Sequence, residues 1–150
     1  MRQGMIFTLS IIICVSVAFA EDGLITKRSA YSVAETLNRL ERVLREKGVI
    51  VFARIDHAAG AESIGRELRA TEVLIFGNPR LGTPLLQSNQ TVGIDLPLKA
   101  LAWEDETGQA WLTYNAPAFL ASRRGITDRR NVVEKMTMAL DDCTNQATRR

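Results

Sequence analysis

The stretch KALAWEDETGQAWLTY, residues 99–114, decides the fold because it has the pattern of a β-hairpin. Two strand-forming segments, 99–104 and 109–114, flank the turn sequence Asp105-Glu106-Thr107-Gly108. A four-residue turn of polar residues that ends in glycine joins neighbouring antiparallel strands. We therefore predict an antiparallel sheet here, with one tryptophan on each strand placed to support the other.

Three segments upstream of the hairpin also predict strands. Leu24–Ser29 is a short candidate, and Thr71–Phe76 is a strand that ends at the turn sequence Gly77-Asn78-Pro79. Val49–Asp56 is rich in β-branched and aromatic residues, and apolar residues fall on both of its faces at its start. Since a strand with two apolar faces is usually covered on both, we expect Val49–Asp56 in the middle of the sheet.

Two amphipathic helices accompany these strands. The first is capped by Ser32, whose hydroxyl can bond the backbone of Glu35, and it ends at Gly48. Apolar residues recur at three- and four-residue spacing along both helices: Val33, Leu37, Leu40 and Leu44 in the first, and Val132, Met136, Ala139, Leu140 and Cys143 in the last. We expect short helices within 58–68, from Thr83-Pro84 onward, and after a cap at Asn115.

The order of these elements, β-α-β-β-β-β-α with additional short helices, predicts an α+β fold. The sheet is expected to be mainly antiparallel, with the two main helices packed on one face of it. We assign residues 21–150 to this single domain, because 150 − 20 = 130 residues are enough to build one hydrophobic core.

Residues 1–20 have the pattern of a secretory signal peptide. Arg2 precedes an apolar stretch, and Ala18-Phe19-Ala20 forms the small-x-small site that signal peptidase requires. The apolar stretch is shorter than the roughly 20 residues that span a bilayer. We therefore expect a periplasmic or secreted protein with no stable membrane insertion after cleavage. An uncleaved membrane anchor is the alternative.

The charge pattern argues against nucleic-acid binding. The net charge of +2 is spread along the chain without a basic stripe, so we expect no nucleic-acid partner.

The cysteine count excludes an intramolecular disulfide in the cleaved chain. Removal of residues 1–20 takes Cys14 with it and leaves Cys143 without an intramolecular disulfide partner. Because Cys143 falls on the apolar face of the last helix, we expect it to be a buried hydrophobe, with a reactive thiol as the alternative.

Six short motifs occur in a characteristic order: Arg54-Ile55-Asp56-His57, Phe76-Gly77-Asn78-Pro79, Gly82-Thr83-Pro84, Asp95-Leu96-Pro97-Leu98, Trp103-Glu104-Asp105 and Tyr114-Asn115-Ala116-Pro117. With these motifs the chain, from about Leu24 to Leu140, resembles the family called domain of unknown function 302. The resemblance implies a fold of the TATA-binding-protein-like α+β class, with helices on a curved antiparallel sheet. It implies candidate positions but no reaction, since the family has no assigned biochemical role.

His57, the single histidine of the chain, follows a predicted strand and is the first candidate site residue. Its imidazole can exchange a proton near neutral pH, or it can simply bond the backbone where the strand ends. The turn residues Gly77, Asn78 and Pro79 are candidates for a ligand cradle beside His57, with turn structure as their alternative role. Asp95 is either an acid partner of His57 or a carboxylate that steadies its own loop.

The sequence gives no sign of a metal or cofactor. No ligand spacing typical of a metal site, no nucleophile elbow and no phosphate loop occurs in it. The resemblance adds a second reason, because relatives carry a histidine where this chain has Arg124, and a two-histidine metal or haem centre would lack one ligand here. We therefore predict no metal site, and no cofactor can be named.

The leading hypothesis is an exported small-molecule-binding module. The loops that carry His57, Asn78 and Asp95 would meet at one end of the sheet and line a pocket. One alternative is an enzyme in which His57 transfers a proton while Asp95 or Asn78 orients the substrate. Another is a self-associating structural protein, for instance a homodimer, that pairs through an exposed sheet edge.

Overall fold

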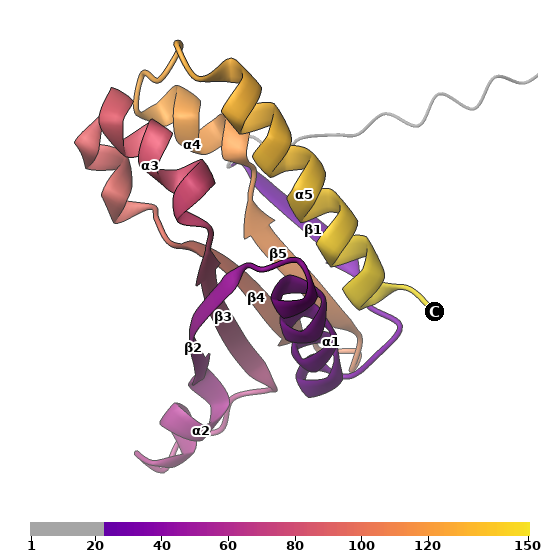
Figure 1. Cartoon of the computed structure of the whole chain (residues 1–150). Helices are drawn as coiled ribbons and strands as arrows, with labels where there is room; N and C mark the ends of the chain where they lie inside the picture. The colour runs from indigo at the N-terminus through magenta and orange to yellow at the C-terminus, as the bar shows by residue number, and fades with distance from the viewer. Residues whose placement is uncertain (1–22) are drawn as a thin grey trace, which may run out of the picture.

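Strands and helices follow one another in the predicted order. The computed structural model describes residues 23–150, and the predicted signal peptide lies outside them. Figure 1 shows the elements, which are β1 (Leu24–Arg28), α1 (Val33–Glu46), β2 (Ile50–Asp56), α2 (His57–Glu62), β3 (Thr71–Gly77), α3 (Pro79–Ser88), the short 3-10 helix η1 (Gln90–Ile94), β4 (Leu98–Glu104), β5 (Ala110–Asn115), α4 (Pro117–Arg123) and α5 (Arg130–Thr148). The predicted α+β fold is confirmed.

The five strands form one antiparallel sheet in the spatial order β1-β5-β4-β3-β2. The β4–β5 hairpin brings the two tryptophans together as predicted, with Trp103 opposite Trp111 and their ring centroids 6.4 Å apart. Its second strand begins at Ala110, one residue later than predicted. In its turn the Asp105 carboxylate accepts the backbone N–H groups of Thr107 and Gln109, and Gly108 adopts a positive φ of 79°. This turn sets the register that brings the two tryptophans together.

The central position predicted for the second strand is wrong, because β2 lies at an edge of the sheet. Val51 packs against the core, whereas Ile50, Phe52 and Ile55 are 46%, 55% and 44% exposed. The register shifts between Val51 and Ala53, so Phe52 sits in a β-bulge without a cross-strand partner. The apolar residues of β2 therefore do not indicate a strand covered on both faces. Val51 lies on the core, and the other apolar side chains are exposed to solvent at the edge of the sheet.

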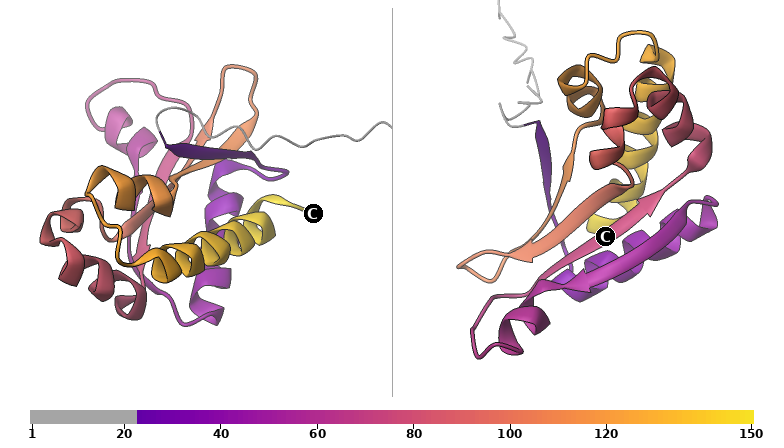
Figure 2. Two further views of the ribbon diagram at one scale, coloured as in Figure 1. Left: turned by 90° about the horizontal axis from the view of Figure 1, so that it is seen from above. Right: turned by 90° about the vertical axis from the view of Figure 1, so that its left-hand side faces the viewer.

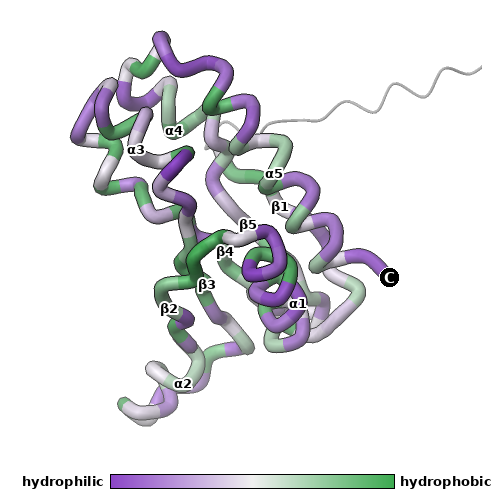
Figure 3. Tube along the Cα trace, viewed as in Figure 1, coloured by the Kyte–Doolittle hydropathy of each residue, from purple (hydrophilic) through white to green (hydrophobic). Residues whose placement is uncertain are grey.

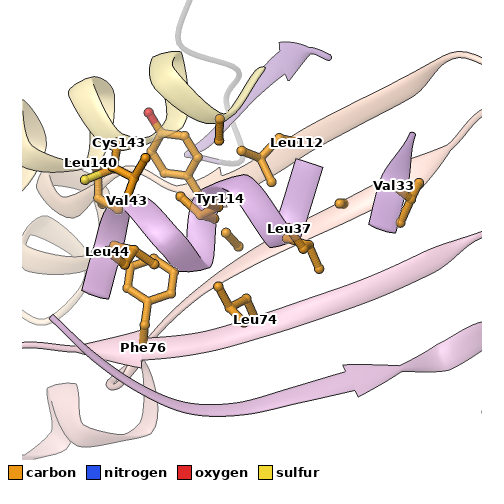
Figure 4. Packing of buried hydrophobic residues seen from close by; sticks show 14 of the residues in the cluster. Val33, Leu37, Val43, Leu44, Leu74, Phe76, Leu112, Tyr114, Leu140 and Cys143 are labelled. Carbon is orange, nitrogen blue, oxygen red and sulfur yellow. The ribbon is translucent and has the colours of Figure 1, made fainter. Parts of the chain in front are cut away.

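Helices α1 and α5 cover one face of the sheet (Figure 2). The Ser32 hydroxyl accepts the backbone N–H of Glu35 at 3.3 Å, as the cap prediction requires, and Gly48 with a φ of 72° follows the helix. Figure 4 shows the main core between these helices and the sheet, which includes Val33, Leu37, Val43, Leu44, Leu74, Phe76, Leu112, Tyr114, Leu140 and Cys143. The predicted burial of Cys143 is confirmed.

A second, smaller hydrophobic cluster lies where α3, η1 and α4 pack around the first half of α5. Its buried members are Leu85, Val92, Ala121, Ile126, Val133 and Met136. Helix α3 begins five residues before the predicted start, because Asn78 caps it by accepting the backbone N–H of Arg80 and Pro79 occupies its first turn. The second proline, Pro84, lies inside the helix rather than at its start.

The predicted cap of the next helix is also wrong. Asn115 closes β5, where it pairs with Leu24, and Ala116 precedes α4 without any side-chain cap. The proline at position 117 fixes a helical φ at the first turn, which explains why α4 can begin there without a polar cap.

The sheet face away from α1 and α5 has no long helix over it in the described part of the chain (Figure 2). Side chains alternate along a strand, so residues next to the buried Leu74, Ala102 and Leu112 point to this outer face. They are half-buried and largely apolar: Val73, Ile75, Leu101, Trp103 and Trp111. Within residues 23–150, no helix has both the length and the apolar character needed to cross a bilayer.

Candidate functional site

A cavity of about 470 Å³ opens where the two hydrophobic clusters meet. Leu44 of α1 and Leu140 of α5 contribute to its wall from the main core, and Phe76 lies at the end of β3. Leu86 of α3 and Met136 of α5 contribute from the second cluster. The volume lies within the range of about 300–1,000 Å³ that is usual for small-molecule sites.

Three glycines of the cavity wall lie close to neighbouring side chains. A Cβ atom added to Gly77 would lie 3.4 Å from Cε2 of Phe52, and one added to Gly93 would lie 3.3 Å from Cδ2 of Leu86. At Gly82 the nearest atom, Cδ1 of Leu96, would be 3.7 Å away. The glycines thus allow the side chains of Phe52, Leu86 and Leu96 to pack directly against backbone at the cavity wall.

The cavity is lined almost entirely by apolar side chains and backbone. Figure 3 shows the hydrophobic colouring of the ends of β2 and β3 that meet below α3. Among the described residues, the polar or ionisable groups on the wall are Lys47, Asn78, Thr83 and Cys143. An apolar molecule that enters would lose its contact with water and gain contact with aliphatic and aromatic carbon, which favours binding.

An ion pair stands at one side of the cavity, where α1 ends beside α5. The Nζ atom of Lys47 lies 2.9 Å from Oδ2 of Asp142, and both side chains are about half exposed. The hydrogen bond between them raises the pKa of Lys47 and lowers that of Asp142. Burial raises the pKa of the neighbouring Cys143 thiol, although the charge of Lys47 opposes this effect. The thiol therefore faces the cavity in its neutral form at neutral pH.

The turn residues Gly77, Asn78 and Pro79 all line the cavity. The sequence singled out this turn, and the structure shows that it also starts α3, since the Asn78 carboxamide oxygen accepts the backbone N–H of Arg80 at 3.0 Å. The carboxamide thus has a structural role at the edge of the cavity. Its role in binding a ligand stays a prediction.

His57 does not lie with these residues. It begins α2 at the far end of β2, because Asp56 pairs with Glu72 whereas Ile50 pairs with Gly77. Six residues of extended strand separate the two ends, which amounts to roughly 20 Å. Figures 1 and 2 show α2 and α3 at opposite ends of the molecule. The expected convergence of loops around His57 is therefore wrong, because consecutive antiparallel strands turn at alternate ends of a sheet.

Asp95 is held by two arginines from the end of α4. Its Oδ2 atom accepts a hydrogen bond from Nε of Arg124 at 2.8 Å, and its Oδ1 atom accepts one from Nη2 of Arg123. The Asp95 side chain is 10% exposed, and it does not line the cavity. Of the two roles considered for it, the structure shows the carboxylate that steadies its loop.

The family described as "Domain of unknown function DUF302" matches residues 25–143. The chain belongs to this family. The match runs from β1 into the second half of α5, and it includes every residue that lines the cavity.

Curated relatives of the DUF302 chain are longer proteins. It is 50% identical over 106 residues to "Fluoride-specific ion channel FluC 1" of Brucella suis, which covers 71% of this chain and 42% of that protein. The same identity and coverage of this chain hold for "Fluoride-specific ion channel FluC 1" of Brucella abortus, of which 39% is covered. The chain thus spans about two fifths of the curated relatives that it matches.

A solved structure has the same fold. The crystal structure of an uncharacterised conserved DUF302 protein from Bacillus stearothermophilus superposes with a TM-score of 0.75. The alignment covers 83% of this chain and 98% of that one, at 20% sequence identity. The likeness supports the architecture of the DUF302 domain.

Three wall residues of the DUF302 cavity escaped sequence reasoning. Lys47 looks like an ordinary cation at a helix end, and Phe52 like part of a buried strand. Cys143 was predicted to be part of the core. The sequence feature that could have indicated its position on the cavity wall is the apolar helical stripe that it shares with Met136. In residues 23–150, no three His, Cys, Asp or Glu side chains are grouped closely enough to hold a metal ion. The arrangement is suited to enclosing an apolar molecule.

Proposed function

We propose that this DUF302 domain binds an apolar small molecule in the cavity between its two hydrophobic clusters. The observation that carries the proposal is the cavity itself, about 470 Å³ with a wall of aliphatic, aromatic and backbone atoms. The cavity is partly open, so its apolar wall is in contact with water. A ligand that covered this wall would remove apolar surface from water, which favours binding.

An enzyme based on His57 has less support. The imidazole is exposed at the start of α2. Of its two predicted partners, Asn78 follows β3 at the other end of the β2–β3 pair, and Asp95 is bound by Arg123 and Arg124. The groups on the cavity wall do not form a nucleophile with an adjacent base, since Cys143 has no histidine beside it. Binding without chemistry therefore fits these side chains better.

The test is the binding of a neutral, apolar fluorescent dye, N-phenylnaphthylamine, whose emission rises in apolar surroundings. We expect saturable binding that decanol displaces. The variant Ala139→Phe places an aromatic ring on the cavity wall and should weaken dye binding about tenfold or more, which corresponds to roughly 1.4 kcal/mol. Ala139 is exposed and lines the cavity, so the variant should still fold.

The matched control is Ala118→Phe. Ala118 is an exposed alanine on α4 that does not line the cavity, so this change should leave the dye affinity as it is. Circular dichroism checks that both variants are folded. No saturable binding, or equal affinities of the two variants, would refute the proposed cavity site.

Self-association is a second candidate, favoured by the uncovered outer face of the sheet. Its two indole N–H groups bond within the face, to Thr113 and Asp105, so the rings present apolar surface outward. Sedimentation velocity tests it. A dimer that Leu101→Lys abolishes and Ile94→Lys preserves would support this candidate, because Ile94 is exposed elsewhere. A monomer at every concentration would dismiss it.

Export is part of the proposal and rests on residues 1–20. The mass of the protein purified from its source cell tests it directly. A chain that begins at Glu21 in the periplasm or medium supports cleavage after Ala20. A chain that retains residues 1–20 in the cytoplasm contradicts it.

A further inference from the structure

We infer that the ligand of this cavity is an amphipathic monocarboxylate, with its alkyl chain in the cavity and its carboxylate at Lys47. The inference rests on the proposed function, because it concerns the same cavity. Among the described residues, Lys47 is the one cationic side chain on a wall that is otherwise apolar or uncharged. A single cation at the side of an apolar cavity is complementary to a molecule with one anionic end.

Lys47 is placed to meet such a headgroup. It follows the last turn of α1, and its backbone N–H bonds the carbonyls of Val43 and Leu44, which fixes the start of the side chain. The side chain is 43% exposed, so the ammonium group lies at the boundary between cavity and water. An alkyl carboxylate bound there keeps its charge hydrated while its chain leaves the water.

Asp142 now occupies the position that a ligand carboxylate would take. Its side chain is 53% exposed, and its two oxygens also accept hydrogen bonds from Nε2 of Gln146, at 3.1 Å each. On release from Lys47, the carboxylate would thus keep a partner and its hydration. Because an exposed ion pair contributes little to stability, exchanging one carboxylate for another at Lys47 costs little free energy.

The surroundings of Lys47 also limit the charge of the headgroup. Glu46 precedes it, Asp142 faces it, and the carbonyl groups at the end of α1 carry partial negative charge. One ammonium group can balance one added negative charge but not two. A monocarboxylate is therefore favoured over a phosphate or another dianion.

The experiment compares decanoate with decanol, which share one alkyl chain and differ in charge. Both displace N-phenylnaphthylamine from the full chain at concentrations below micelle formation, near neutral pH. The variant Lys47→Met should weaken decanoate about three- to tenfold and leave decanol unchanged. Asp142→Asn removes the competing carboxylate and should tighten decanoate about twofold or more. Lys135→Met, an exposed lysine on α5 outside the cavity wall, is the matched control and should change neither affinity.

The outcomes separate this inference from the proposed function. If decanol binds and Lys47→Met changes decanoate no more than Lys135→Met does, the headgroup assignment is overturned and the cavity site stands. Tighter binding of decyl phosphate than of decanoate to the wild type would also overturn the headgroup assignment and leave the cavity site in place. If neither decanol nor decanoate displaces the dye, and Ala139→Phe has no effect on it, the cavity site itself fails.

Discussion

Replacement of Asp95 by asparagine should loosen the junction between η1 and α4. The carboxylate is largely buried and holds both Arg123 and Arg124. Asparagine keeps the shape of the side chain and one acceptor oxygen but removes the negative charge. Both guanidinium groups then lose an ionised partner, and hydrogen bonds to a charged acceptor are about twice as strong as neutral ones.

The expected loss can be built from the two contacts. A hydrogen bond between charged groups contributes about 1.5–3 kcal/mol when partly buried, whereas an exposed ion pair contributes about 0.2–1 kcal/mol. The Arg124 side chain is 27% exposed and that of Arg123 is 43% exposed, so solvent screens the second pair more. We expect Asp95→Asn to lower the free energy of unfolding by about 2 kcal/mol, most of it through Arg124.

Urea unfolding followed by circular dichroism measures this loss. Double-mutant cycles with Arg124→Gln and Arg123→Gln should give coupling energies of about 1 kcal/mol and below about 0.5 kcal/mol, respectively. Asp128→Asn is the control, because that carboxylate is 53% exposed and its removal should matter less. A loss for Asp95→Asn below about 0.5 kcal/mol, or equal coupling to both arginines, would refute the reasoning.

Three further changes test other parts of the structure. Hydrogen bonds from Thr107 and Trp111 lower the pKa of Asp105, so its contribution to stability is complete above about pH 4 and is lost as the pH falls toward the lowered pKa. Asp105→Asn should therefore flatten the acid side of a plot of urea midpoint against pH, and an unchanged slope would contradict this. Gly108→Ala should cost about 1 kcal/mol in thermal unfolding because its φ is 79°, whereas Gly60→Ala, in helix α2 with open space around it, should be neutral or stabilising. Equal effects of the two glycine changes would argue against the turn geometry. His57→Ala should leave dye binding unchanged, because roughly 15 Å of strand β2 separates it from Phe52 on the cavity wall. A weaker affinity measured in the same titration would show that His57 reaches the ligand.

Local patterns in the sequence predicted most of the fold. The Asp105–Gly108 turn, the Ser32 cap and the apolar stripe of the last helix each depend on residues within a few positions of one another. Such features follow from backbone geometry and local hydrogen bonds. The order of the strands in the sheet does not follow from local patterns. The apolar residues of β2 do not indicate whether β2 lies at the edge or in the middle of the sheet.

The candidate site was half predicted for the same reason. Asn78 could be recognised because a turn that precedes a helix has a distinctive local sequence, and it does lie on the cavity wall. The separation of His57 from Asn78 depends on the pairing of β2 with β3, which only the three-dimensional register determines. Asp95 pairs with arginines 28 and 29 residues further along the chain, and no local sequence pattern predicts ion pairs over such a separation.

The stacked rings of Trp103 and Trp111 give the domain an internal optical probe. Their interplanar angle is 24°, and they sit on the opposite side of the sheet from the cavity. Two indoles held this close couple electronically, so their dichroism reports whether the hairpin is intact. A ligand that does not absorb near the indole emission, such as decanol, cannot quench them by contact from the cavity. A change in their emission upon decanol binding would therefore report a movement transmitted through the strands.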